Sequence, residues 1–400
     1  MSTTTSDTRL WALLLMLSGN MLLDALEVST TVIALPSIGR DLHLTPAQTS
    51  WLMTGFAVGF GGFIVLGGRL TAAFGRRRVY LWALLVFAIA SVAAGLATDE
   101  GTLVATRVVK GVCVALTAPT GLAIIAGTFP DGPPRHRALS VYSLFGASGF
   151  SAGLLLSGTL TMLSWRWTLL FSGPVALVLL LAGLRLVPHD TPAAAPVTPG
   201  PNPPAPAGLA GNGRILRSAA GAAALNGPFW GFLLVSTFEM QSELRWSPLT
   251  AGLVLLPASL PLALSAMFSG RMVSRFGAAR LIVVGSLSAL AGYAWYLATD
   301  RRWTYPAVVL PAVVLVGVGF MLSFSALHIQ AVTGVPPSRQ RIVSGVYQTS
   351  VQIGGAAMLV LLAVAAGSGR HPALVVIAAV AAAGLLVALG GLRRQPSQQH

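Results

Sequence analysis

GRLTAAFG, at residues 68–75, returns 202 residues later as GRMVSRFG at residues 270–277. A second repeat pairs PPRHR at residues 133–137 with PPSRQR at residues 336–341, at nearly the same distance. Each of these segments lies between two long apolar runs and carries arginine. A repeat of this kind predicts two halves that share one succession of structural elements.

The composition places the apolar runs in a membrane. Of the 400 residues, 54% are hydrophobic and 9% are charged, and the mean hydropathy is +0.77. Soluble domains carry about 25% charged residues, so this chain has too few charged side chains to cover its surface in water. A membrane-spanning helix needs about 20 apolar residues, and the chain has room for about a dozen. We therefore expect an all-α membrane protein.

Hydropathy along the chain predicts twelve membrane-spanning helices. They are expected near residues 10–35, 47–68, 79–97, 102–129, 138–162, 168–187, 216–240, 248–270, 280–298, 305–330, 341–366 and 371–392. Asn226, Gly227 and Pro228 interrupt the seventh run, so eleven or thirteen spans stay open as alternatives. The first run is longer than the apolar core of a signal peptide, and we expect it to be retained.

The basic residues indicate which side of the membrane each connection faces. The chain has 25 Lys and Arg against 11 Asp and Glu, and its formal net charge is +14. Of the 25, 17 lie at the termini and in the even-numbered loops, whereas 6 lie in the odd-numbered loops. This bias predicts a multi-pass inner (plasma) membrane protein with both termini in the cytoplasm. Short scattered clusters do not form a basic stripe, so we expect no nucleic acid partner.

A proline-rich segment divides the chain. Eight prolines lie between Pro188 and Pro206, and such a segment forms an extended linker rather than a helix. We expect an N-terminal six-helix bundle at residues 1–187, a cytoplasmic linker at 188–213 and a C-terminal six-helix bundle at 214–400. Because the repeated loops match between the halves, the bundles should be pseudo-symmetric about an axis along the membrane normal, with a substrate cavity between them.

Four charged residues lie inside predicted spans, where charges are costly and mark functional sites. Asp24 and Glu27 are three residues apart on the first span, so they share one helix face, and Arg107 and Lys110 do the same on the fourth. Glu27 and Lys110 each lie eight residues from the outer end of their span, which places both ~12 Å deep. We expect Glu27 to pair with Lys110 or Arg107, with Asp24 beside the pair. We expect this group to couple proton movement to transport; a static pair that only locks the two spans together is the alternative.

Several motifs resemble those of a known family. They are EVSTTVIALP at residues 27–36, GRLTAAFGRRR at 68–78, RVVKG at 107–111 and the glycines at 149, 153 and 158. Together they resemble the major facilitator superfamily and, within it, the drug:proton antiporters that usually have fourteen spans. The resemblance implies the major facilitator fold, a part for Arg107 and Lys110 in proton transfer, and a part for Gly149 and Gly153 in antiport.

The 68–78 loop has two interpretations that can both hold. The resemblance implies a conformational latch between the bundles, with Gly68, Gly75 and Arg76 as its gating residues. Independently, Gly75 suits a left-handed turn and Gly68 permits close backbone approach, while the arginines at 76–78 attract anionic headgroups at ~1 kcal/mol each. Where the family's loop motif is acidic, this chain has Ala72 and Ser274. It also has Lys110 in place of Gln and Leu154 in place of Pro, and it lacks the two extra central spans.

Five further residues are candidates for substrate contact: Asn20, Asn226, Trp230, Glu239 and Gln241. The first three lie within predicted spans, and the last two lie near the outer end of the seventh. For Glu239, we favour an interfacial position beside Glu243 and Arg245 over one that faces the cavity. For His328 we expect a hydrogen-bonded packing role rather than titration.

These observations favour a proton-coupled exporter of a small hydrophobic, drug-like or antibiotic compound. Cys113 is the only cysteine, and no Walker loop, HExxH motif or group of metal ligands is visible, so we expect neither an enzyme nor a bound cofactor. The proton motive force would drive transport, and membrane lipid would surround a monomer. One alternative is a proton-coupled importer of a small polar solute. Another is a membrane sensor or scaffold that transports nothing.

Overall fold

The computed structural model describes residues 3–189, 212–265, 268–299, 307–365 and 370–392, and every regular element within these ranges is a helix. The first half contains α1 (Thr3–Asp41), α2 (Pro46–Phe74), α3 (Arg76–Leu96), α4 (Glu100–Thr128), α5 (Pro133–Leu163), α6 (Trp165–Leu170) and α7 (Ser172–Leu186). The second half contains α9 (Gly213–Phe238), the π-helical turn η1 (Glu239–Glu243), α10 (Pro248–Ser265), α11 (Ser269–Phe276), α12 (Ala278–Ala298), α13 (Val309–Val332), α14 (Pro337–Ala365) and α15 (Arg370–Leu392).

The helices match the predicted spans closely, with one correction. Within the described ranges, eleven helical segments are long and apolar enough to cross a membrane. The predicted span at 248–270 is not one described helix: α10 ends at Ser265 and α11 begins at Ser269, with residues 266–267 outside the described part. The apolar stretch of α10, Pro248–Pro261, is shorter than the others. Most of the predicted linker, 190–211, also lies outside the described residues.

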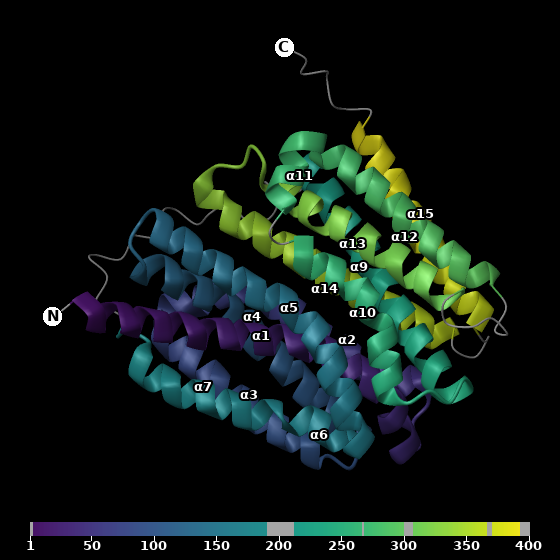
Figure 1. Cartoon of the computed structure of the whole chain (residues 1–400), viewed down its shortest axis with the longest axis horizontal. Helices are drawn as coiled ribbons and strands as arrows, with labels where there is room; N and C mark the ends of the chain where they lie inside the picture. The colour runs from purple at the N-terminus through teal and green to yellow at the C-terminus, as the bar shows by residue number, and fades with distance from the viewer. Residues whose placement is uncertain (1–2, 190–211, 266–267, 300–306, 366–369, 393–400) are drawn as a thin grey trace.

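The helices form two bundles, one from each half of the chain. Figure 1 shows α1 to α7 at the lower left and α9 to α15 at the upper right. In the first bundle, α1 packs along α5 and α2 along α4; in the second, α12 packs along α13 and α9 along α14. This is the all-α, two-bundle architecture that the repeats predict.

The repeated loops have the same backbone in both halves. Gly75 ends α2 with φ +87°, and Gly277 ends α11 with φ +78°. This positive-φ region disfavours any residue with a Cβ, so the predicted turn at Gly75 is confirmed. The predicted close approach at Gly68 is wrong for this conformation, because nothing lies within 4 Å of a Cβ built there, and the same holds at Gly270.

Small residues let α1 and α5 pack with their backbones nearly in contact. A Cβ on Gly149 would lie 2.6 Å from the Cβ of Ala25, and one on Gly153 would lie 3.0 Å from the carbonyl oxygen of Leu26. Helices approach this closely in membranes when glycine removes the side chain from the interface. The predicted packing role of Gly149 and Gly153 is therefore confirmed, while their part in antiport stays a prediction.

Gly149→Ala is expected to destabilise the protein by about 1–3 kcal/mol, because the added methyl group overpacks the seam between α1 and α5. The matched control is Gly62→Ala on α2, where nothing lies within 4 Å of the new Cβ. Cys113 is the only cysteine and is 3% exposed, so its reaction with a thiol-reactive dye on heating reports unfolding. If both variants unfold at the same temperature, the seam is looser than described.

The two bundles meet along α5 with α10 and along α2 with α14. A Cβ on Gly158 would lie 2.8 Å from the Cα of Leu249, and one on Gly252 would lie 2.6 Å from the carbonyl oxygen of Leu154. Both glycines lie toward the helix ends that the sequence predicts to face outside. The bundles are therefore in backbone contact near that side.

Candidate functional site

One buried carboxylate on α1 holds two cations from α4. Glu27 Oε2 lies 2.7 Å from Arg107 Nη1, and Glu27 Oε1 lies 2.7 Å from Lys110 Nζ. All three side chains are at most 1% exposed. The sequence predicted a pair with one cation or the other, and the structure brings Glu27 together with both.

Further contacts fix the position of the two cations. Arg107 also donates to the backbone carbonyls of Glu27, at 3.1 Å, and Leu52, at 3.3 Å. Lys110 donates to the Ser172 hydroxyl on α7 at 3.0 Å. Arg107 lies over the ring of Phe56, 4.6 Å from the centroid, and Lys110 lies 4.8 Å from the ring centroid of Phe87. The cluster thus connects α1, α2, α3, α4 and α7 within the first bundle.

Asp24 lies one turn from Glu27 on α1 but has different partners. Its Oδ2 accepts hydrogen bonds from Thr117 Oγ1 at 2.9 Å and from Asn20 Nδ2 at 3.2 Å, and the residue is 4% exposed. Both donors are neutral, and no salt bridge joins Asp24 to a cation among the described residues. The two acids therefore differ in kind: Glu27 is neutralised by cations, whereas Asp24 is held by neutral donors.

The local sequence explains why α4 presents its cations at this depth. α4 begins after Asp99, whose carboxylate accepts from the backbone N–H of Thr102 at 2.8 Å and from its hydroxyl at 2.7 Å. These hydrogen bonds hold the pKa of Asp99 below its usual value, so it remains a charged N-cap. With the helix start fixed there, Arg107 and Lys110 follow two and three turns later, level with Glu27.

The asparagines and the tryptophan predicted to contact substrate have contacts within the protein. Asn20 donates to Asp24, and Asn226 Nδ2 donates to the carbonyl oxygen of Val351 at 2.8 Å. Trp230 is 4% exposed, and a Cβ built on Gly355 would lie 3.3 Å from its indole. The side-chain amides of both asparagines are occupied in this conformation, and substrate contact by all three residues stays a prediction.

Gln241 connects the two bundles. Its Nε2 on η1 donates to the carbonyl oxygen of Ile33 on α1 at 2.9 Å, and the residue is 2% exposed. Its Oε1 is buried without a hydrogen-bond partner among the described residues. The contact lies near the predicted outer side, beside the backbone contacts of α5 with α10.

Glu239 is buried, and among the described residues its ion-pair partner is Arg370 rather than Arg245. It is 6% exposed, and its Oε2 lies 3.0 Å from Nε of Arg370 on α15. The hydroxyl of Tyr296 on α12 donates to the same oxygen at 2.8 Å. The π-helical turn begins at Glu239 and directs this side chain into the second bundle, while Gln241 contacts the first.

Tyr296→Phe is expected to cost about 1.5 kcal/mol, because it removes a hydrogen bond to a buried charged group. Tyr293→Phe on the same helix is the matched control: Tyr293 is 1% exposed and has no hydrogen bond to the described residues. Thermal unfolding followed by Cys113 labelling should show a lower midpoint for Tyr296→Phe alone. Equal midpoints would show that the Tyr296–Glu239 bond contributes nothing.

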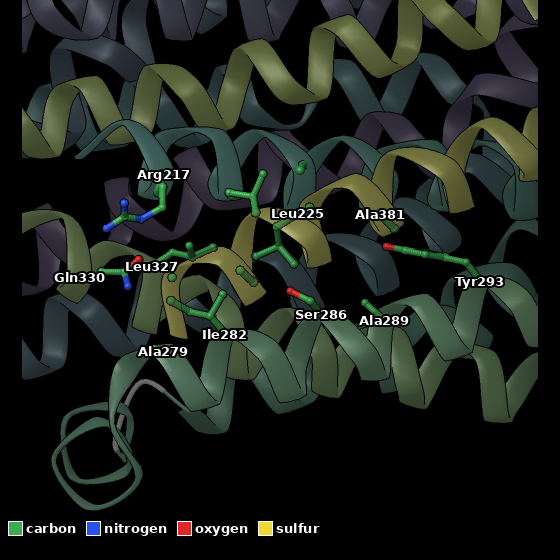
Figure 2. A pocket seen from close by; sticks show the side chains of 16 residues that line it. Arg217, Leu225, Ala279, Ile282, Ser286, Ala289, Tyr293, Leu327, Gln330 and Ala381 are labelled. Carbon is green, nitrogen blue, oxygen red and sulfur yellow. The ribbon is translucent and has the colours of Figure 1, made fainter. Parts of the chain in front are cut away.

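A narrow cavity lies inside the second bundle, between α9, α12, α13 and α15. Arg217 and Gln330 lie at one end and Tyr293 at the other (Figure 2). It has space of about 30 Å³ for water-sized molecules, whereas sites for drug-sized ligands have about 300–1,000 Å³. It therefore holds at most a few waters and is not a site for a drug-sized substrate in this conformation.

An aromatic ladder, which no sequence motif indicates, crosses from the first bundle into the second. The ring of Phe150 on α5 lies 5.9 Å from that of Phe229 on α9, and Phe229 lies 4.5 Å from Phe320 on α13. The series continues through Phe324 to Tyr347 on α14. His328 lies 5.0 Å from Tyr347 and 3.2 Å from the Ser344 hydroxyl, so its predicted packing role is confirmed.

Two bundles of membrane-length helices, one with a buried charge cluster, define a polytopic helical transporter of the secondary class. The chain belongs to the Major Facilitator Superfamily, because the model of that family matches residues 17–359. The resemblance of the sequence motifs to this family is thereby confirmed.

The relatives include antibiotic resistance and export proteins. The puromycin resistance protein pur8 of Streptomyces alboniger is 31% identical, over 88% of this chain and 81% of the relative. The cephamycin export protein CmcT of Amycolatopsis lactamdurans is 29% identical, over 92% and 87%. Among solved structures, the nucleoside transporter NupG superposes with a TM-score of 0.78 at 13% identity, covering 94% of this chain and 99% of that one. The last match shows the fold alone.

Proposed function

We propose that this protein exports small hydrophobic compounds, antibiotics among them, in exchange for protons that enter the cell. The observation that carries the proposal is the buried group of Glu27, Arg107 and Lys110, with Asp24 one turn away. Ionisable side chains at this depth are costly and are kept where they move ions or protons.

Glu27 and Asp24 have different roles in the proposed mechanism. Glu27 holds α1 against α4 through its ion pairs with Arg107 and Lys110. Because its carboxylate already accepts from two cations, it gains nothing by taking up a proton. Asp24 exchanges the proton, because it lies in a buried site with neutral donors, where the uncharged acid avoids the cost of an unpaired charge. Protonation from outside and release to the cytoplasm would favour different packings of α1 against α4 and α5.

The aromatic ladder between the two bundles supports an apolar or aromatic substrate class. The aromatic ladder from Phe150 to Tyr347 offers ring faces and edges to an apolar or aromatic compound. The names of the relatives, puromycin resistance and cephamycin export, support an antibiotic substrate and the outward direction. Both termini would face the cytoplasm of a plasma membrane protein, as the distribution of Arg indicates.

In this orientation the described conformation is closed to the outside. The backbone contacts at Gly158 and Gly252 and the Gln241–Ile33 hydrogen bond all lie near the outer ends of their helices. At the other side, nothing lies within 4 Å of a Cβ built on Gly68 or Gly270. The substrate would therefore enter from the cytoplasm in this state.

The test is accumulation of puromycin in a bacterium that lacks its own drug pumps, with and without a protonophore. We expect several-fold lower accumulation with the protein than with an empty vector, and loss of the difference when the protonophore is added. Higher accumulation would favour the importer. An unchanged level for puromycin and a panel of aromatic antibiotics would contradict export.

A further inference from the structure

A groove runs along the exposed surface of the first bundle. Its walls are α2 and α3, and its floor is α4. It forms because α2 and α3 diverge from the turn at Gly75 and pack more extensively on α4 than on each other. Its volume is about 770 Å³, and twelve of its thirteen lining residues are apolar. Phe63 and Phe74 from α2 and Trp82 from α3 are exposed along it.

The one charged residue that lines the groove is Arg78, near the turn that closes the predicted cytoplasmic end. Its two neighbours are already engaged. Arg76 donates to the carbonyl oxygen of Ala123 on α4 at 3.2 Å. Arg77 donates to the carbonyl oxygens of Val187 at 3.1 Å and Leu184 at 2.7 Å, at the end of α7. Arg78 is exposed and has no hydrogen-bond or ion-pair partner in the part of the chain that the structure describes.

The three arginines therefore differ in their contacts within the protein. Arg77 caps the carbonyl end of α7, and Arg76 binds a carbonyl within α4. Of the three, Arg78 is the one that can offer its whole guanidinium to an external anion. A guanidinium binds phosphate through paired N–H groups. From Arg78 to Val86 the groove follows α3 for eight residues, or ~12 Å into the apolar region.

We propose that this groove binds one anionic phospholipid of the cytoplasmic leaflet. Its phosphate lies at Arg78, and one acyl chain lies along α4 against Val109 and between the walls that α2 and α3 form. A lipid fits better than a protein helix, because the groove faces the membrane and is polar only where the headgroup region begins. An anionic headgroup is favoured, because the only charge is positive and this leaflet carries anionic lipids. The proposal does not depend on the proposed transport function.

The experiment is native mass spectrometry of the purified protein with an equal mixture of phosphatidylglycerol and phosphatidylcholine that carry the same acyl chains. We expect wild type to retain phosphatidylglycerol about fivefold more than phosphatidylcholine, the factor expected for one Arg at an anionic surface. Arg78→Gln should reduce the ratio to about one. The matched control is Arg69→Gln, in the same repeat segment, exposed and outside the groove. An equal loss in both variants would show diffuse attraction to the basic loop and overturn the proposal.

A second variant tests the acyl-chain part of the groove. Val109→Trp fills the groove at a side chain that is 38% exposed, so folding should be preserved, and retention of both lipids should fall while Arg78 stays in place. Glycerol phosphate, which has no acyl chain, should not displace phosphatidylglycerol; displacement would show that Arg78 acts alone. Displacement by puromycin at micromolar concentration would make the groove a substrate site and overturn the lipid assignment.

Discussion

Glu27→Gln is expected to lower the free energy of unfolding by about 3–5 kcal/mol, because it leaves two buried cations without a counter-charge. Arg107 is 1% exposed and Lys110 is fully buried, so water cannot replace the lost carboxylate. A glutamine amide has one acceptor oxygen in place of two and supplies no charge. Thermal unfolding in detergent, followed by the reaction of Cys113 with a thiol dye, measures the loss.

The control is the same chemical change at an exposed pair. Asp41 pairs with Arg166 at 2.7 Å, but their side chains are 49% and 38% exposed, and such pairs contribute about 0–1 kcal/mol. Asp41→Asn should therefore unfold close to wild type. Adding Lys110→Met to Glu27→Gln should recover part of the loss, because one stranded charge is removed. If Glu27→Gln is as stable as Asp41→Asn, the buried cluster is not charged as described.

The charge cluster could be predicted because a helix has a fixed rise per residue. Once the ends of two antiparallel spans are known, the rise per residue places Glu27 and Lys110 at the same depth in the membrane. The spacing of Arg107 and Lys110 places both cations on one face of their helix. Gly75 was predictable for a similar reason, because a tight connection of two helices requires a positive φ there. In both cases the relevant distances are short along the chain or are set by helix geometry alone.

The contacts of Glu239, Gln241 and the arginines after Gly75 could not be predicted in this way. Glu239 meets Arg370, 131 residues away, and Gln241 meets Ile33, 208 residues away. The π-helical turn at Glu239 adds a residue to one turn and rotates the side chains that follow it, and no local sequence pattern marks such a turn. Likewise, only the positions of α4 and α7 show that Arg76 and Arg77 meet carbonyl groups.

Asp24→Asn is expected to abolish proton-driven accumulation of puromycin in proteoliposomes while downhill exchange of puromycin continues. The amide is nearly the same size and can accept from Thr117 and Asn20 as the carboxylate does, so folding should be preserved. It cannot take up and release a proton, so an imposed pH difference has no group to act on. With wild type, the pH difference should concentrate puromycin several-fold in vesicles whose lumen is the acidic side, since protons leaving the vesicle would drive the compound in.

Two variants separate proton exchange from packing. Thr117→Val removes a donor to Asp24 but keeps the carboxyl group, so accumulation driven by the pH difference should survive in it. Asp41→Asn, the same chemical change at an exposed position, should transport as wild type does. If Asp24→Asn still concentrates puromycin as wild type does, the proton is carried elsewhere and the division of roles between Asp24 and Glu27 is wrong. If it loses downhill exchange as well, while unfolding at the wild-type temperature, Asp24 contacts the substrate path rather than the proton alone.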